Sequence, residues 1–210
     1  MMKFYDCATA PSPRRARMVI AEKRVEVETI EVDLRSGEQF SDAFMAVNPR
    51  CTVPVLVTDA GESLCDNASI ARYLEAVFPD PPLMGRSPVE QARVAEWIWR
   101  AEFEGLMSVM EVLRNTSKAM KDRALPGPAP VAQIPELAER GRARGMRFFE
   151  ALDERLAEAP WLGGDGFSFA DITAFVFVEF AGWVKMAPGE ELESLMRWRS
   201  ACAARPSAAV

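Results

Sequence analysis

The chain has four cysteines and no histidine, and this limits the chemistry that its side chains can do. Without histidine, neither a Ser-His-Asp triad nor a Cys-His pair can form, and no metal can be held by imidazole. No two cysteines form a Cys-x-x-Cys pair, so neither a zinc knuckle nor a two-thiol redox centre is expected. The cysteines are Cys7, Cys51, Cys65 and Cys202. We therefore predict no metal, and free thiols in a reducing compartment.

The charge and hydropathy of the chain exclude two further classes of function. The net charge is −6 and the one short basic run is Arg14, Arg15 and Arg17, so no nucleic-acid partner is expected. No apolar stretch approaches the length of a membrane span, and the first residues do not form a signal peptide. We therefore predict a cytoplasmic protein with no membrane partner. Apolar residues make up 49% of the 210 residues, enough for a sizeable core.

The elements that must position any reactive side chain follow from the apolar pattern of the first eighty residues. Short apolar or alternating segments predict strands, and amphipathic segments predict helices. The expected strands cover Met2–Tyr5, Val25–Val32, Val53–Val57 and Glu62–Cys65, and the expected helices cover Arg14–Glu22, Ser41–Met45 and Asp66–Phe78. The order is βαβαββα, and Tyr5 on the first strand is expected to pack in the core or between the domains.

The remainder of the chain is predicted to be helical. Three prolines and a glycine make residues 79–85 a linker. Ser87, Pro88 and Glu90 then combine three signals for the start of a helix. Helices are expected over Gln91–Arg114, Glu136–Leu156, Asp171–Val184 and Leu192–Ala204, with a proline-rich loop over Ala124–Pro135. We therefore predict two domains, residues 1–82 and residues 87–210.

Three motifs, met in this order along the chain, carry a resemblance to a known family. Asn48–Leu56 reads Asn-Pro-Arg-Cys-Thr-Val-Pro-Val-Leu, Leu64–Ile70 reads Leu-Cys-Asp-Asn-Ala-Ser-Ile, and Phe167–Ile172 reads Phe-Ser-Phe-Ala-Asp-Ile. They resemble the Asn-Pro-x-Gly-x-Val-Pro-x-Leu segment, the Leu-x-Glu-Ser-x-Ala-Ile segment and the helical capping motif of the glutathione S-transferases. The resemblance is to a bacterial and fungal cytosolic subgroup. It implies a thioredoxin-like domain that binds glutathione, followed by an all-helical domain that shapes a second-substrate site.

The resemblance places glutathione, as a co-substrate, on the first domain. In this family the Val-Pro bond is cis, and Val53 before Pro54 would pair with the cysteinyl part of glutathione like a strand edge. Asp66 would bind the γ-glutamyl ammonium, and Asn67 with the first helical N–H groups would bind the γ-glutamyl carboxylate. Alternatively, Asp66 is only the N-cap of its helix. The other residues expected to contact glutathione are Ala10, Pro11, Gln39 and Thr52.

The group that activates the glutathione thiol is left open by the resemblance. Relatives use a Tyr, Ser or Cys near the start of the first helix, and the usual Ser or Cys position falls on Ala10 or Pro11. Ser12 and Thr9 are the preferred substitutes, because a hydroxyl can donate a hydrogen bond to a thiolate beside the positive end of a helix. Cys7 ranks third, and a water or the backbone N–H groups of residues 10–12 could replace a side chain.

The glutathione segment departs from the family at two adjacent positions. Cys51 and Thr52 stand where relatives often have Gly and Lys. The lysine would have held the glycyl carboxylate, so Gln39 and Arg50 are expected to compensate. Cys51 could form a mixed disulfide with the peptide thiol, although a packed small side chain is the simpler interpretation.

The second-substrate pocket is expected between the loop Cys7–Ser12 and the helix near Glu104–Asn115. Met107 would supply an apolar, adaptable lining. The polar residues expected to face the substrate are Glu111, Arg114 and Asn115.

The resemblance predicts a glutathione S-transferase, in which the glutathione thiolate attacks a small, mainly apolar electrophile in a detoxification reaction. Three alternatives stay open: a glutathione-dependent isomerase, a thiol reductase in which Cys7 forms a mixed disulfide, and a non-catalytic glutathione-transferase-like binding protein. The resemblance also implies a twofold homodimer, built on the helices over Asp66–Phe78 and Gln91–Arg114.

Overall fold

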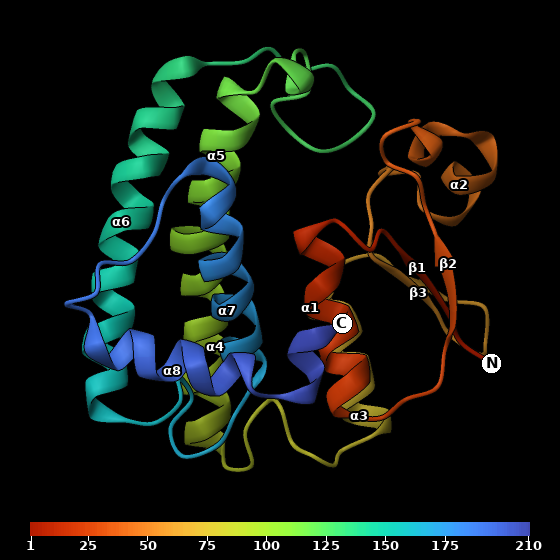
Figure 1. Cartoon of the computed structure of the whole chain (residues 1–210). Helices are drawn as coiled ribbons and strands as arrows, with labels where there is room; N and C mark the ends of the chain where they lie inside the picture. The colour runs from red at the N-terminus through yellow and green to blue at the C-terminus, as the bar shows by residue number, and fades with distance from the viewer. The chain divides into compact units, whose positions relative to one another are not determined.

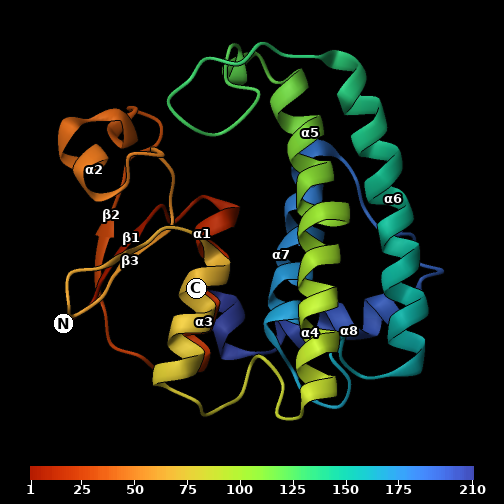
Figure 2. The same cartoon turned by 180° about the vertical axis from the view of Figure 1, so that it is seen from behind.

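The structure of this chain is a computed structural model that describes all 210 residues. They form two compact units, each shown from opposite sides in Figures 1 and 2. The first unit comprises Met1–Pro81 with Pro126–Ala129 and Val210, and the second comprises Pro82–Leu125 with Pro130–Ala209. None of the helices combines the length and apolar character needed to cross a membrane.

The first unit is built on a mixed four-stranded sheet in the order β2-β1-β3-β4. Its strands are β1 (Lys3–Asp6), β2 (Glu28–Glu31), β3 (Val55–Val57) and β4 (Ser63–Leu64), and its helices are α1 (Pro11–Glu22), α2 (Asp42–Val47) and α3 (Asn67–Val77), with a 3-10 turn η1 (Glu38–Phe40). β1 runs parallel to β2 and antiparallel to β3, which is antiparallel to β4. Helices α1 and α3 lie side by side on one face of the sheet (Figure 1). The predicted thioredoxin-like order βαβαββα is confirmed.

The side chains of successive β1 residues point to opposite faces of the sheet. Phe4 is buried on one face, and Tyr5 faces α2, where its ring meets that of Phe44 edge-on at 5.9 Å between centroids. Val32 and Val55 complete this cluster. The expectation that Tyr5 packs in the core is confirmed.

Two boundaries in the first unit differ by three residues from those predicted, and the other differences are smaller. Helix α1 begins at Pro11 rather than Arg14, because proline at the first turn loses an N–H that has no helical partner there. Strand β2 begins at Glu28 rather than Val25. The Val25 N–H is bound to the Ile20 carbonyl at the end of α1, so the chain pairs with β1 only after it has left the helix.

The second unit is entirely helical, as predicted. Its elements are α4 (Pro88–Arg100), the π-helical segment η2 (Ala101–Leu106), α5 (Met107–Thr116), α6 (Pro135–Glu158), α7 (Phe169–Ala181) and α8 (Glu193–Ala203), with 3-10 turns η3 (Lys118–Met120), η4 (Gly182–Val184) and η5 (Pro206–Ala209). The predicted capping box at the start of α4 is present: Glu90 N–H donates to Ser87 Oγ at 3.2 Å, and Ser87 N–H donates to Glu90 Oε2 at 3.1 Å.

The long helix expected over Gln91–Arg114 is continuous in path but π-helical in its middle (Figure 2). Gly105 lies in this segment, where Phe148 of α6 and Phe177 of α7 approach the backbone. A Cβ at Gly105 would lie 2.9 Å from the Phe148 ring and 3.0 Å from the Phe177 ring. The wider π turns re-aim the side chains that follow, and π segments often occur at functional sites.

Helix α7 is the buried centre of the second unit, with every residue buried except Glu179. At its start the carboxylate of Asp171 accepts four hydrogen bonds, from the backbone N–H groups of Ser168 and Leu162, the Ser168 hydroxyl and the Trp198 indole, at 2.7–2.9 Å. Burial raises the pKa of Asp171, and these hydrogen bonds oppose the rise. The Ser168–Asp171 motif therefore fixes the start of this helix.

Candidate functional site

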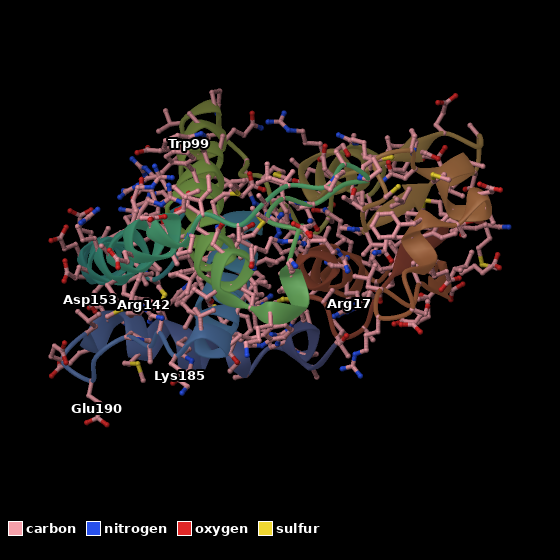
Figure 3. The ribbon with its side chains drawn as sticks, turned by 90° about the horizontal axis from the view of Figure 1, so that it is seen from above. Arg17, Trp99, Arg142, Asp153, Lys185 and Glu190 are labelled. Carbon is pink, nitrogen blue, oxygen red and sulfur yellow. The ribbon has the colours of Figure 1, made fainter.

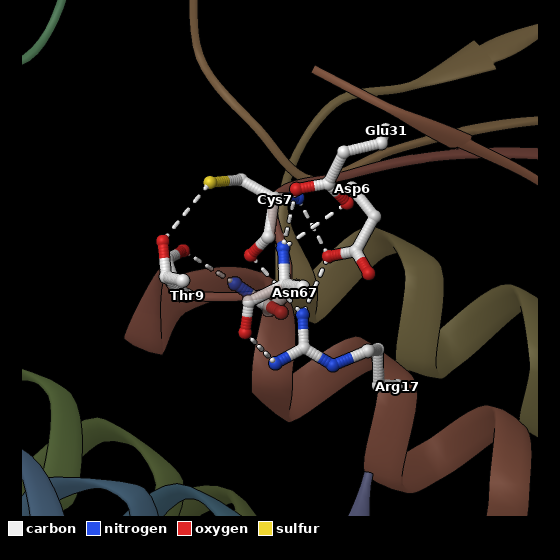
Figure 4. A network of polar contacts seen from close by, with 8 residues as sticks. Asp6, Cys7, Thr9, Arg17, Glu31 and Asn67 are labelled. Carbon is white, nitrogen blue, oxygen red and sulfur yellow. Dashed lines mark hydrogen bonds and ion pairs between the residues drawn. The ribbon is translucent and has the colours of Figure 1, made fainter. Parts of the chain in front are cut away.

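The loop between β1 and α1 is a tight turn that carries the three candidate activating side chains. Ala10 N–H donates to the Cys7 carbonyl at 2.9 Å and closes the turn over Ala8 and Thr9. Thr9 and Ser12 are exposed, whereas Cys7 is only 6% exposed. The Cys7 sulfur lies 3.6 Å from Thr9 Oγ1 (Figure 4). The hydroxyls are thus accessible to a ligand, and the thiol much less so.

The first turn of α1 offers a single free backbone donor. Three N–H groups would normally point out of this end of the helix, at residues 11, 12 and 13. Pro11 and Pro13 have none, so Ser12 supplies the only one. If backbone N–H groups stabilise an anion at this end of α1, they must therefore be those of Ser12 and of the neighbouring loop.

A hydrogen bond joins the starts of α1 and α3. The Asn67 Nδ2 group donates to Ser12 Oγ at 3.0 Å. Asn67 is 3% exposed, and its Oδ1 atom has no partner. Because Ser12 Oγ accepts this bond, the Ser12 hydroxyl hydrogen is available for another acceptor. Two predicted site residues, 55 positions apart, are brought together here.

Asp66 is the N-cap of α3. Its Oδ1 atom accepts the Ser69 N–H at 2.7 Å, and the Ser69 hydroxyl donates to the Asp66 carbonyl at 3.0 Å. The side chain is exposed, and the N–H groups of Asn67 and Ala68 point out of the helix without a helical partner. The N-cap role is therefore present, and the same end of the helix presents donors to an anion.

The peptide bond between Val53 and Pro54 is cis, as expected. The backbone N–H and C=O of Val53 make no hydrogen bond within the chain. Asn48, fully buried, braces the preceding loop by donating to the Thr52 carbonyl at 2.7 Å and to Thr52 Oγ1 at 3.1 Å. The result is a short stretch of unpaired, half-buried backbone at Val53.

Cys51 and Gln39, two residues of the predicted glutathione segment and its surroundings, are both buried. Cys51 is buried and has a φ of +55°, in the left-handed region that favours glycine, and its sulfur lies 3.7 Å from the Pro49 carbonyl. Gln39 is 2% exposed, and its Oε1 atom has no partner. Arg50 is exposed, with Nη2 3.5 Å from the Cys65 carbonyl.

The candidate second-substrate residues all lie on α5. Met107 is 36% exposed. The Glu111 carboxylate pairs with Arg140 at 2.9 Å and with Arg144 at 3.3 Å. The partners of these α5 side chains lie on α6 and in the loop before it. The second-substrate pocket that the sequence predicts between the two domains stays a prediction.

Arg114 and Asn115 are engaged with the backbone. Arg114 Nη1 donates to the Arg123 carbonyl at 2.8 Å, and burial together with the charge of Arg123 lowers the pKa of Arg114. The Asn115 amide donates to the Glu111 carbonyl at 2.8 Å and accepts the Ile134 N–H at 2.9 Å.

Comparisons with known proteins decide the family. The model of the glutathione S-transferase N-terminal domain matches residues 9–77, and that of the C-terminal domain matches residues 108–206. Glutathione S-transferase 2 of Saccharomyces cerevisiae is 33% identical over 98% of this chain and 87% of its own length. A crystal structure of a glutathione S-transferase domain-containing protein from Marinobacter aquaeolei is 35% identical, covers 98% of both chains and has a TM-score of 0.89.

The chain belongs to the glutathione S-transferase family. The family uses glutathione as a substrate, and transferase activity is its common property. Two relatives carry other activities in their names: the maleylacetoacetate isomerase of Pseudomonas aeruginosa, and the disulfide-bond oxidoreductase YfcG of Escherichia coli. Each is 28% identical to this chain. The isomerase match covers 65% of this chain and 80% of the isomerase, and the oxidoreductase match covers 81% of this chain and 76% of the oxidoreductase. Membership therefore leaves the specific reaction open.

Three charged residues were not predicted from the sequence to belong to the candidate site. Asp6, Arg17 and Glu31 form a network around the backbone of Cys7 and Ala8 (Figure 4). Burial raises the pKa of Asp6, and the Arg17 guanidinium opposes the rise. The three residues come from β1, α1 and β2 and share no periodicity, so nothing in the sequence pattern links them.

Proposed function

We propose that this chain conjugates glutathione to a small, mainly apolar electrophile. The observation that carries the glutathione-binding part of the proposal is the unpaired backbone of Val53. A peptide can complete such an edge with its own N–H and C=O, as in strand addition, and the cysteinyl residue of glutathione offers both. The motif register of the family supports this placement.

The γ-glutamyl end of glutathione would then bind at the start of α3. Asp66 supplies an exposed carboxylate for the ammonium, and the Asn67 and Ala68 N–H groups suit the carboxylate. Asn67 Oδ1 is buried without a partner, and an ammonium or amide N–H of the peptide would satisfy it. Gln39, Thr52 and Arg50 are left for the glycyl end.

Ser12 is our leading candidate for stabilising the glutathione thiolate. Its Oγ accepts from Asn67, which leaves the hydroxyl hydrogen free to be donated, and its N–H is the one free donor of the first turn. Ala10 and Pro11 flank it and would line the site. Thr9 is the second candidate because its hydroxyl is exposed.

A thiol reductase is the alternative that a specific residue supports. Cys7 lies in the same turn, and its sulfur is close to Thr9 Oγ1. A mixed disulfide would need the Cys7 thiolate to reach the glutathione sulfur, and the 6% exposure of Cys7 disfavours this. The isomerase alternative rests on a relative of that name. The non-catalytic alternative rests on Ala10 or Pro11 at the position where relatives carry the Ser or Cys that activates the thiol.

We also propose a twofold homodimer in the cytoplasm. Trp99 and Phe103 are 58% and 48% exposed and lie four residues apart, in α4 and in η2. The Trp99 and Phe103 rings stack at 5.1 Å, and Trp99 lies at the surface of its unit (Figure 3). This exposed aromatic stripe suits the core of an interface between two copies.

A substrate panel tests the proposed function. Purified chain is assayed with glutathione and, in turn, a chloronitroaromatic compound, an epoxide, a peroxide and a mixed disulfide. Turnover of the first two classes supports conjugation. Turnover of the disulfide alone would favour the reductase, and saturable glutathione binding without any turnover would favour the non-catalytic alternative.

A further inference from the structure

Every backbone polar group of Cys7 and Ala8 is held by a hydrogen bond, and three charged side chains supply most of them. The Cys7 N–H donates to Asp6 Oδ1 at 2.7 Å, and the Ala8 N–H donates to the Glu31 carboxylate at 2.9 and 3.2 Å. The two carbonyls accept from Arg17, at 3.2 Å for Cys7 and 3.0 Å for Ala8. Figure 4 shows the guanidinium below the turn.

Arg17 is the residue that ties this arrangement together. Its Nη1 atom reaches Asp6 Oδ1 at 2.6 Å as well as the Cys7 carbonyl, while Nη2 reaches the Ala8 carbonyl. A planar fork places two terminal nitrogens at separate positions, and the single nitrogen of lysine cannot stand at both. Since Arg17 belongs to α1, these bonds hold the turn to the same helix that carries Ser12.

The charges of the network also bear on the sulfur site. Asp6 is 2% exposed, and Glu31 is exposed, so two carboxylates lie at this turn with Arg17 as the cation bonded to it. A nearby negative charge disfavours a thiolate, and a positive charge favours it. The guanidinium therefore offsets the carboxylates next to the candidate thiolate position.

We propose that Arg17 is a positioning residue for thiol activation: it fixes the Cys7–Ala10 turn and neutralises Asp6, so that Thr9 and Ser12 stay in place against the glutathione sulfur. The inference rests on the proposed function, because the sulfur is that of the bound co-substrate. Arg17 acts through the turn, since its two terminal nitrogens are bonded to Asp6 and to the carbonyls of Cys7 and Ala8.

Arg17→Lys tests the fork while it keeps the charge. Amide hydrogen exchange, followed without ligand, should quicken at Cys7 and Ala8. With glutathione, kcat should fall by about tenfold or more while KM for glutathione changes by less than about threefold, because the Val53 edge and the start of α3 are intact. The pKa of the bound thiol should rise. The double variant Asp6→Asn with Arg17→Met removes both charges, so no carboxylate is left buried alone, and it should lose turnover in the same way.

Lys23→Met is the matched control on the same helix. Lys23 is buried at the other end of α1, where its ammonium donates to the carbonyls of Phe78 and Pro81 at 2.6 and 2.9 Å and pairs with Glu75 at 2.7 Å. This variant should lower the melting temperature without changing kcat, the bound-thiol pKa or exchange at Cys7 and Ala8.

Two results would overturn the inference. If Arg17→Lys binds and turns over glutathione like the wild type with unchanged exchange, Arg17 positions nothing. If its activity loss merely equals that of Lys23→Met, its role is in stability alone. In both cases the proposed function survives, whereas wild-type protein that does not bind glutathione would overturn the proposed function and this inference with it.

Discussion

Ser12 and Asn67 are far apart in the sequence and hydrogen-bonded in the structure, and this contact gives each of them a second role. Asn67 stands where relatives often have serine, and the longer amide reaches the start of α1. The Ser12 hydroxyl is then oriented by an acceptor bond and left with one hydrogen to donate. At the scale of single residues, this hydrogen bond connects the proposed thiolate site with the proposed γ-glutamyl site.

Replacing the three candidate side chains one at a time should rank them as activators. Ser12→Ala should raise the pKa of the bound glutathione thiol and lower turnover by roughly tenfold to a hundredfold, about 1.4–2.7 kcal/mol of transition-state stabilisation. Thr9→Ala should have a smaller effect, and Cys7→Ala little, because the thiol is buried. The exposed Ser63→Ala on β4 is the control. Loss of disulfide reduction on Cys7→Ala alone would instead favour the reductase.

The charge of Asp66 can be tested apart from its role as N-cap. Asp66→Asn keeps an oxygen for the Ser69 N–H and should leave the melting temperature nearly unchanged. It should still weaken glutathione binding by about 1.5–3 kcal/mol, because a charged hydrogen bond to the ammonium is lost. Calorimetry with Asp59→Ala as a control measures this. Unchanged affinity would remove Asp66 from the site.

At the scale of elements, helix α6 packs against α5 through two glycines. A Cβ at Gly141 would lie 2.6 Å from the Ser108 carbonyl oxygen, a backbone atom of α5 that cannot move aside alone. A Cβ at Gly145 would lie 2.6 Å from Ser108 Oγ, a side-chain atom of α5, and closer still to the methyl group of Met186. The close approach of the helices therefore depends on the absence of these side chains.

Gly141→Ala should destabilise the second unit by about 1–3 kcal/mol, the usual effect of overpacking, despite the better helix propensity of alanine. Gly182→Ala is the matched control, since nothing lies within 4 Å of its Cβ position and its φ is −58°. It should stabilise slightly, by about 0.4–1 kcal/mol. Thermal unfolding of both variants measures the difference. Equal melting temperatures would show that the helices can separate at little cost.

The sequence predicted most elements because their signals are local. The capping box at Ser87 and Glu90 follows from a few adjacent residues. The π segment around Gly105 could not be predicted in this way. It depends on how closely Phe148 and Phe177, from two other helices, approach the backbone.

The candidate site was predictable in outline only. Asp66, Asn67 and Val53 were identified by motif, and their contact with glutathione stays a prediction. The structure shows Asp66 as the N-cap of α3 and the backbone of Val53 without a partner in the chain. Arg17 and its partners were missed, because a contact between β1, β2 and α1 has no signature in the order of residues. The hydrogen bond between Asn67 and Ser12 could not be predicted for the same reason, because the packing of α1 against α3 brings these residues together.

At the scale of the whole molecule, the exposed aromatic stripe predicts an interface. Replacing Trp99 and Phe103 together by glutamate should convert a dimer into a monomer, since two charges would be buried in an apolar contact. Light scattering at micromolar concentration measures the mass. Val89→Glu, on an exposed position near the start of α4, serves as a control outside the stacked pair. A wild-type monomer would contradict the predicted assembly.

We propose that this chain binds glutathione and ionises its thiol, and ultraviolet difference titration of the bound thiolate in wild-type protein tests this claim most directly. The hydroxyl and N–H of Ser12, together with the positive end of α1, predict an apparent pKa lowered by about two units, which requires about 2.7 kcal/mol. The bound thiol should then be largely ionised at neutral pH. Saturable binding with a thiol that titrates as it does free in solution would contradict the claim, and would leave a protein that holds glutathione without activating it.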